Sequence, residues 1–209
     1  MEYMEFGTYG SPVVLVQPFD RRSADGIEKE ISEIHGLNDT DFRLIAVLVD
    51  NWNNDLSPWN APAVYGKEDF EGGAPDTLEA ILGYLRTDAG TDEPKYYIGG
   101  YSLAGLFALW AAYQTDMFGG VAAASPSVWY PDFTEYMGGH DIHAGKVYLS
   151  LGDAESRTRH PVMSTVGERI EQARDILTSS CVECTLEWNP GNHFADPDIR
   201  TAKAFAWLL

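Results

Sequence analysis

The feature that most constrains this chain is a regular alternation between short apolar segments and segments of helical period. The apolar segments are rich in β-branched or small residues, a composition typical of buried strands. They cover residues 12–16, 44–49, 95–99, 120–124, 147–151 and 184–188, and a further strand is expected at residues 2–6. The segment at 184–188 is more mixed in polarity, so we expect it to lie nearer an edge of the sheet.

Apolar residues recur at helical spacing in the intervening segments. They predict helices over residues 24–35, 77–86, 103–113, 164–177 and 198–209. Strands that alternate with helices imply right-handed crossovers and a mainly parallel central sheet with helices on both faces. Because no repeat, low-complexity tract or linker divides the chain, we expect residues 1–209 to form one compact α/β domain.

Two irregular stretches, residues 50–73 and 126–145, are long for simple connections. Both follow expected strands. Open α/β sheets bind their ligands outside the carboxyl ends of the strands. We therefore expect the functional site at that edge of the sheet.

The balance of charge limits the classes of partner. The chain has 32 Asp and Glu residues against 14 Lys and Arg residues, a formal net charge of −18. Such a surface repels phosphate backbones and anionic head groups, so we expect no nucleic-acid or membrane partner. No apolar run approaches the roughly 18–20 residues of a membrane span, and the acidic start lacks the order of a secretory signal. A cytoplasmic protein is expected.

The strongest chemical motif is a serine between an expected strand and an expected helix. In the run Gly100-Tyr101-Ser102-Leu103-Ala104-Gly105, small residues stand two positions before and two after Ser102. This is the context of a nucleophile elbow, in which the serine hydroxyl lies at the start of a helix. There the Leu103 N–H is placed to stabilise an oxyanion. The alternative is a serine that merely caps a helix.

A serine nucleophile needs a base, and a third group must orient that base. Of the five histidines, His193 alone follows the last expected strand and precedes the final helix. A loop there would hold the imidazole over the sheet edge that carries Ser102, so we predict His193 as the base.

The acid is expected between serine and histidine along the chain. Glu155 and Asp153 both follow the strand that ends near Leu151. Glu155 has the longer reach and is preferred, whereas Asp153 is suited to stabilising the turn. Either could also be an ordinary solvated carboxylate.

Further site residues are predicted from position. The second oxyanion donor is expected after the first long strand, where Pro18 has no N–H, so Phe19 is the first candidate and Asp20 the next. Aromatic residues near strand ends, namely Tyr101, Trp52 and Trp129, are candidates for the walls of a substrate pocket. No metal or organic cofactor is expected.

Four motifs together resemble the esterase family of α/β-hydrolases that includes enterochelin-esterase-like enzymes, S-formylglutathione hydrolases and mycolyltransferases. The motifs are Gly100–Gly105, Ala124–Trp129, Gly152–Glu155 and Gly191–His193. The resemblance implies an α/β-hydrolase fold without a separate lid domain. It also implies a serine esterase that acts on small-molecule esters through Ser102, His193 and Glu155.

This chain departs from the family pattern at two places. Ala104 replaces the usual glycine, and Gln17-Pro18-Phe19 stands where relatives often carry a His-Gly or Asp-Gly pair. The second departure leaves the oxyanion donor open. Two other functions also remain open: an acyltransferase that uses the same three residues, and a non-catalytic binding module on this fold.

Overall fold

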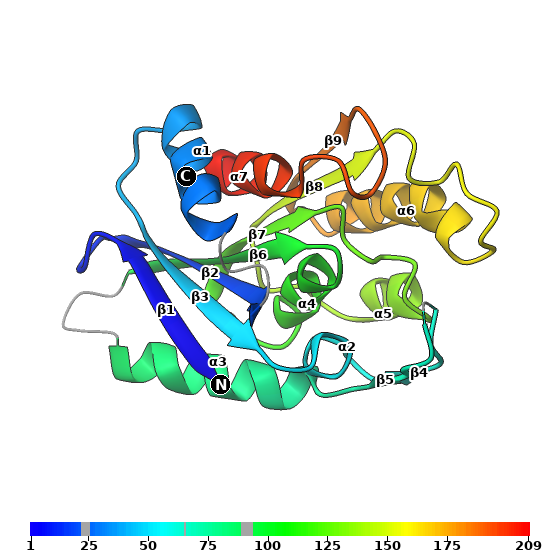
Figure 1. Cartoon of the computed structure of the whole chain (residues 1–209), viewed down its shortest axis with the longest axis horizontal. Helices are drawn as coiled ribbons and strands as arrows, with labels where there is room; N and C mark the ends of the chain where they lie inside the picture. Colours follow the sequence, from blue (N-terminus) through cyan, green and yellow to red (C-terminus); the bar gives the residue numbers. More distant parts are fainter. Residues whose placement is uncertain (22–25, 65, 89–93) are drawn as a thin grey trace.

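The computed structural model describes residues 1–21, 26–64, 66–88 and 94–209. Within these ranges seven strands form one sheet in the order β1-β3-β2-β6-β7-β8-β9 (Figure 1). The strands are β1 (Glu2–Gly7), β2 (Val13–Asp20), β3 (Arg43–Val49), β6 (Lys95–Tyr101), β7 (Phe118–Ala124), β8 (Lys146–Gly152) and β9 (Glu183–Asn189). β1 runs antiparallel to β3, and the other neighbours are parallel. The predicted mainly parallel sheet is confirmed.

Helices cover both faces of the sheet. α1 (Ile27–Leu37) and α7 (Pro197–Leu208) pack on one face, and α3 (Ala74–Asp88), α4 (Leu103–Ala111) and α6 (Val166–Ser179) pack on the other. The strands supply both cores because successive side chains point to opposite faces. In β2, for example, Val14 and Val16 join the core under α4, whereas Leu15 joins the core under α1 and α7.

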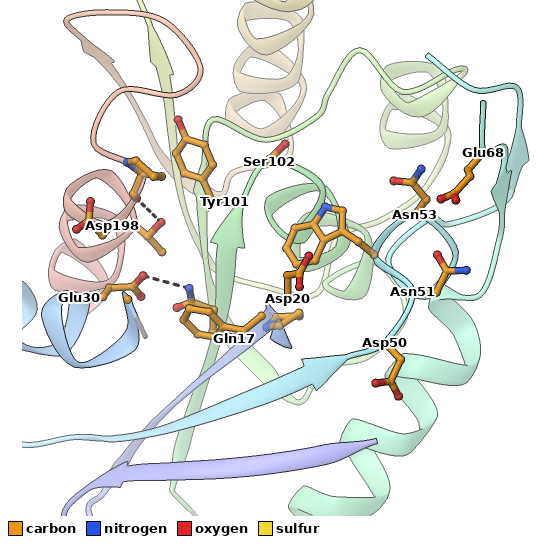
Figure 2. A pocket seen from close by; sticks show the side chains of 16 residues that line it. Gln17, Asp20, Glu30, Asp50, Asn51, Asn53, Glu68, Tyr101, Ser102 and Asp198 are labelled. Atoms are coloured by element: carbon orange, nitrogen blue, oxygen red, sulfur yellow. Dashed lines mark hydrogen bonds between the residues drawn. The ribbon is translucent and has the colours of Figure 1, made fainter. Parts of the chain in front are cut away.

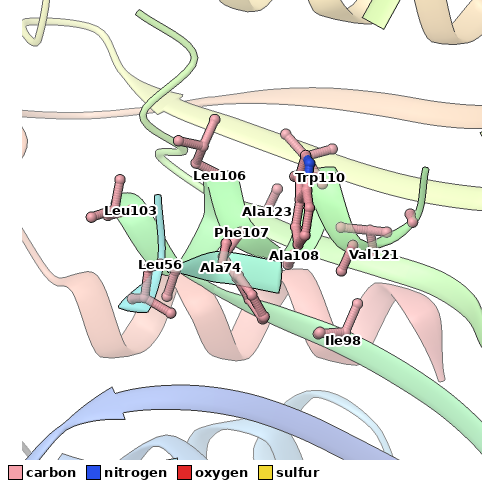
Figure 3. Close-up of a cluster of buried hydrophobic side chains, with 14 of the residues drawn as sticks. Leu56, Ala74, Ile98, Leu103, Leu106, Phe107, Ala108, Trp110, Val121 and Ala123 are labelled. Atoms are coloured by element: carbon pink, nitrogen blue, oxygen red, sulfur yellow. The ribbon is translucent and has the colours of Figure 1, made fainter. Parts of the chain in front are cut away.

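The helix that follows the serine is buried on all sides. All nine residues of α4 are buried, among them Leu106, Phe107 and Trp110. They pack with Ile98 of β6, Val121 of β7 and Leu56 (Figure 3). An apolar helix in this position fixes the start of α4 against the ends of two central strands, and Ser102 lies at that start.

The two stretches expected to be irregular hold short elements instead. Residues 50–73 contain α2 (Trp52–Asp55) and a two-stranded sheet of β4 (Asn60–Ala61) and β5 (Phe70–Glu71), and residues 126–145 contain α5 (Phe133–Gly139). Aromatic contacts join the two stretches, because Trp59 and Phe70 both pack against Tyr130. These elements are too short to show a hydrophobic period, and tertiary packing stabilises them.

Three other boundaries bear on the predictions. β2 continues to Asp20, so the expectation that this strand ends at Val16 and is followed by a loop over residues 17–22 is wrong for residues 17–20, which pair with β3. The first two positions of the helix predicted over residues 24–35 lie outside the described residues. Within the described residues, α1 starts at Ile27. β9 lies at the edge of the sheet, as expected.

In the described ranges, no helix combines the length and the apolar character that crossing a membrane requires.

Candidate active site

Ser102 lies on a sharp turn between β6 and α4. Its backbone has φ 58° and ψ −118°, a conformation that a non-glycine residue rarely adopts. Backbone hydrogen bonds hold it there: the Ser102 N–H donates to Ala124 O over 3.1 Å, and Ser102 O accepts from the Leu106 and Ser127 N–H groups. The strained turn therefore presents the hydroxyl at the carboxyl edge of the sheet.

Close packing around the turn explains the small residues of the motif. A Cβ added at Gly100 would lie 2.6 Å from Ala104 Cβ, and one added at Gly105 would lie 2.9 Å from Gly100 O. Alanine is accommodated at position 104 because Gly100 opposite it has no side chain. The departure from the usual glycine at this position thus leaves the geometry of the turn intact.

Three side chains from three strand ends form a continuous hydrogen-bonded chain. Ser102 Oγ lies 3.0 Å from His193 Nε2, and His193 Nδ1 lies 2.7 Å from Glu155 Oε2. Ser102 follows β6, Glu155 follows β8 and His193 follows β9. Parallel strands bring these loops to one edge, so the residues that the sequence predicted to meet are in contact.

The second carboxylate oxygen of Glu155 is surrounded by donors. Oε1 accepts from the Gly152 N–H at 2.7 Å, from Ser125 Oγ at 2.8 Å and from Arg200 Nη1 at 3.1 Å. Burial alone would raise the pKa of this carboxyl group, but the hydrogen bonds from His193, Gly152 and Ser125 outweigh burial and hold the pKa of Glu155 below its ordinary value. The group is thus an ionised, fixed acceptor for the imidazole.

Asp153, the alternative acid, has a different contact. Its Oδ1 accepts from the Gly191 N–H over 3.0 Å, and its own N–H donates to Asn189 O over 2.8 Å. It therefore joins the loop after β8 to the loop after β9, which carries His193. This is the turn-stabilising position that the sequence analysis considered for Asp153.

Arg200 is a buried cation beside the three side chains, and the sequence analysis missed it. Its side chain is 3% exposed and contacts Glu155 Oε1, Ser125 Oγ, the Tyr101 hydroxyl and Pro190 O. The Tyr101 hydroxyl in turn donates to His193 O over 2.9 Å. Arg200 follows an apolar residue in the final helix, and no sequence pattern separates it from a solvated arginine.

Two serines of the Ser125-Pro126-Ser127 motif also belong to the site. Ser125 donates to Glu155, and Ser127 Oγ lies 3.3 Å from Ser102 Oγ. Both are 1% exposed. The motif carries part of the family resemblance, but no role is predicted from the sequence for either serine.

Two cavities flank the three side chains. The larger, about 950 Å³, is lined by Ser102, Tyr101, Trp52 and Phe19 among others (Figure 2). The smaller, about 190 Å³, is lined by His193, Glu155 and Trp129. Tyr101 and Trp52 thus share a cavity with the serine, whereas Trp129, expected beside them, lies in the second cavity on the histidine side.

Solved structures match nearly the whole chain. An IroE-like serine hydrolase from Shewanella oneidensis matches with a TM-score of 0.77 and 16% identity, over 99% of this chain and 74% of that one. The siderophore hydrolase EstA from Aspergillus nidulans matches with a TM-score of 0.66 and 18% identity, over 94% and 81%. An S-formylglutathione hydrolase from Agrobacterium tumefaciens matches with a TM-score of 0.64 and 12% identity, over 98% and 87%. The chain has the α/β-hydrolase fold.

The predicted fold class and the resemblance drawn from the motifs are thereby confirmed. A capsule O-acetyltransferase of Neisseria meningitidis serogroup A has the same fold, with a TM-score of 0.58 and 10% identity over 99% of this chain and 90% of that one. No family model and no curated protein sequence matches the chain.

In an α/β-hydrolase the oxyanion donors are the N–H after the nucleophile and an N–H near the end of an earlier strand. Leu103 is the first residue of α4, where backbone N–H groups have no partner within the helix. The two candidates for the other donor, Phe19 and Asp20, are the last two residues of β2, and both line the larger cavity together with Ser102.

Proposed function

We propose that this protein is a serine hydrolase of carboxylic esters. The observation that carries the proposal is the continuous hydrogen-bonded chain from Ser102 Oγ through the His193 ring to Glu155. A strained serine at a helix start, an imidazole within 3.0 Å and an ionised, buried carboxylate are the parts that acyl transfer requires. The fold shared with hydrolases and esterases supports the same assignment.

The contacts define the role of each group. Because Nδ1 faces the Glu155 carboxylate, Nδ1 holds the ring proton and Nε2 accepts the proton of Ser102. The serine oxygen attacks the ester carbonyl, and the Leu103 N–H with the second donor stabilises the oxyanion. His193 then gives the proton to the departing alcohol. Water attacks the acyl-enzyme with His193 again as base, which releases the acid and restores Ser102.

Acyl transfer to an alcohol acceptor is the second candidate function. The match to the Neisseria meningitidis capsule O-acetyltransferase supports it, since that enzyme has the same fold. Both functions share the acyl-enzyme and differ in whether water or an alcohol removes the acyl group. Analysing the products of p-nitrophenyl acetate cleavage with glycerol present separates them: acetate alone identifies a hydrolase, and acetylated glycerol identifies a transferase.

The experiment that tests the proposal compares wild type with Ser102→Ala on p-nitrophenyl acetate. We expect kcat to fall by about 10⁴-fold or more, because removing a triad nucleophile leaves only binding and oxyanion contacts. Ser164→Ala is the matched control, since Ser164 is exposed and is not among the residues that line either cavity beside the three side chains.

A fluorophosphonate probe gives a second readout that needs no substrate. It should label wild type and Ser164→Ala and leave Ser102→Ala unlabelled. Full activity of a folded Ser102→Ala protein would overturn the proposal, and an unlabelled wild type would indicate a non-catalytic binding module.

A further inference from the structure

The larger cavity beside Ser102 is strongly acidic. Its lining includes five acidic residues, namely Asp20, Glu30, Asp50, Glu68 and Asp198. Among the described residues that line it there is no lysine, arginine or histidine. Asp50 pairs with Arg21, and Asp198 pairs with Lys29, two basic residues outside the lining. A cavity lined in this way attracts cations and repels anions.

Glu30 and Gln17 form an incompletely paired polar cluster in this cavity. Each residue is 3% exposed. Gln17 Nε2 donates to Glu30 Oε2 over 3.2 Å (Figure 2). In the described part of the chain, Gln17 Oε1 and Glu30 Oε1 have no hydrogen-bond partner. Both residues line the same cavity as the serine, and leaving buried acceptor atoms unpaired is costly.

The pKa of Glu30 indicates which kind of partner its carboxyl group lacks. Burial raises the pKa of Glu30 to about 8, the hydrogen bond from Gln17 opposes the rise, and the nearby charge of Asp198 adds to it. A buried carboxyl group without a neighbouring cation holds a proton instead. A ligand that brings both a positive charge and N–H donors would replace that proton.

We propose that this cavity recognises esters that carry a primary ammonium group, which Glu30 and Gln17 bind. The inference rests on the proposed esterase function and names the class of substrate. An ammonium group supplies three donors and no acceptor, which suits two unpaired acceptor oxygens. Its hydrogen bond to a carboxylate is charge-assisted and stronger than that of a neutral hydroxyl group. An ester with a carboxylate at the same position would be repelled.

The test measures inhibition of p-nitrophenyl acetate hydrolysis by three molecules of equal chain length: n-hexylammonium, 1-hexanol and hexanoate. We expect the inhibition constant of hexylammonium to be at least about 10-fold lower than that of hexanol, and hexanoate to be the weakest inhibitor. Equal inhibition by hexylammonium and hexanol would overturn the proposal. This wild-type comparison requires no variant to fold.

Two variants that each replace one carboxyl group by an amide locate the effect. In Glu30→Gln the advantage of hexylammonium over hexanol should fall to about 3-fold or less. In Glu171→Gln, at an exposed position on α6, it should stay as in wild type. An equal loss of the advantage in both variants would overturn the assignment to Glu30, because it would indicate a general effect of net charge.

Calorimetry separates this inference from the proposed function. Binding of hexylammonium to Ser102→Ala needs no turnover, so it can be measured even if the protein hydrolyses no ester. Absence of hydrolysis by wild type would refute the esterase function. If hexylammonium binds Ser102→Ala no more tightly than hexanol does, the ammonium site fails whatever the activity of the wild type.

Discussion

Glu155 and Asp153 lie two residues apart on one loop and contact different groups. Glu155 reaches the His193 ring, whereas Asp153 accepts a hydrogen bond from the Gly191 backbone. One carboxylate therefore acts on the imidazole directly, and the other acts on the loop that carries it. The two residues also differ in position, since Asp153 directly follows Gly152 at the end of β8 and Glu155 lies two residues further along the chain.

We predict that Glu155→Gln lowers kcat by about 10³–10⁴-fold, because an amide does not hold the imidazole in the tautomer that accepts the serine proton. Asp153→Asn is the matched control and should lower kcat by less than about 10-fold. Steady-state rates on p-nitrophenyl acetate measure both. If Asp153→Asn proves the more damaging of the two, Asp153 is the acid of the triad.

Glu30 leads to a prediction about stability. Its folded-state pKa of about 8 lies above the ordinary value of 4.5, so the native protein binds more protons than the unfolded chain between these values. The free energy of unfolding therefore falls as pH rises through this window. Glutamine does not ionise, so Glu30→Gln should be more stable than wild type at pH 9, by up to about 5 kcal/mol.

Urea unfolding of wild type and Glu30→Gln at pH 5 and pH 9 measures this effect. The advantage of the variant should be larger at pH 9 than at pH 5. The same advantage at both pH values would show that Glu30 does not ionise in this window. Glu171→Gln again controls for the loss of one charge, since its side chain is exposed.

At the scale of elements, the sharp turn that carries Ser102 depends on close contact between β6 and α4. Gly100 stands where a Cβ would lie 2.6 Å from Ala104 Cβ. Ala104 is in the first turn of the buried α4 and has no room to move away. The turn is thus fixed by packing as well as by its own hydrogen bonds.

We predict that Gly100→Ala destabilises the protein by about 1–3 kcal/mol, as expected for overpacking. It should also lower kcat, because relief of the contact moves Ser102 away from His193. Gly83→Ala is the control: Gly83 lies within α3 with no atom near its Cβ position, so alanine there should be neutral or stabilising. Thermal unfolding and esterase rates of both variants provide the measurements. Wild-type stability and activity in Gly100→Ala would contradict the packing argument.

The long elements and the elbow could be predicted from the sequence because each carries a local signal. β3 is continuously apolar from Leu44 to Val49, α6 shows a clear helical period, and the motif around Ser102 stands between a strand and a helix. α5 carries no such signal, since it has seven residues and ends in two glycines. It depends on contacts with α6 and with the aromatic residues around Trp59.

Polar residues that become buried were the hardest to predict. Arg200 and Glu30 each lie on a helix among charged neighbours and read as solvated side chains. Their burial follows from the packing of α7 and α1 over the sheet, which brings distant residues such as Tyr101 and Gln17 to them. Local sequence does not encode these partners, so neither the buried arginine nor the acidic cavity could be read from it.

At the scale of the whole molecule, the surface and the larger cavity carry charge of the same sign. The formal net charge of the chain is −18. The described residues that line the cavity include acidic side chains and no basic one. The long-range field and the local field therefore favour the same class of ligand. Such agreement raises the rate at which cationic molecules reach a cleft, and salt weakens it.

The position of β9 at the border of the sheet has a consequence for how the activity of the protein responds to heating. In the part of the chain that the structure describes, β8 is the one strand that pairs with β9, and His193 lies in the loop that follows β9. Borders of a structure open more readily than its centre. Fraying of β9 would separate the His193 imidazole from the Ser102 hydroxyl while the apolar core around α4 stays folded. On heating, the protein would then lose activity at a temperature well below that of its spectroscopic unfolding transition, and cooling would restore the activity.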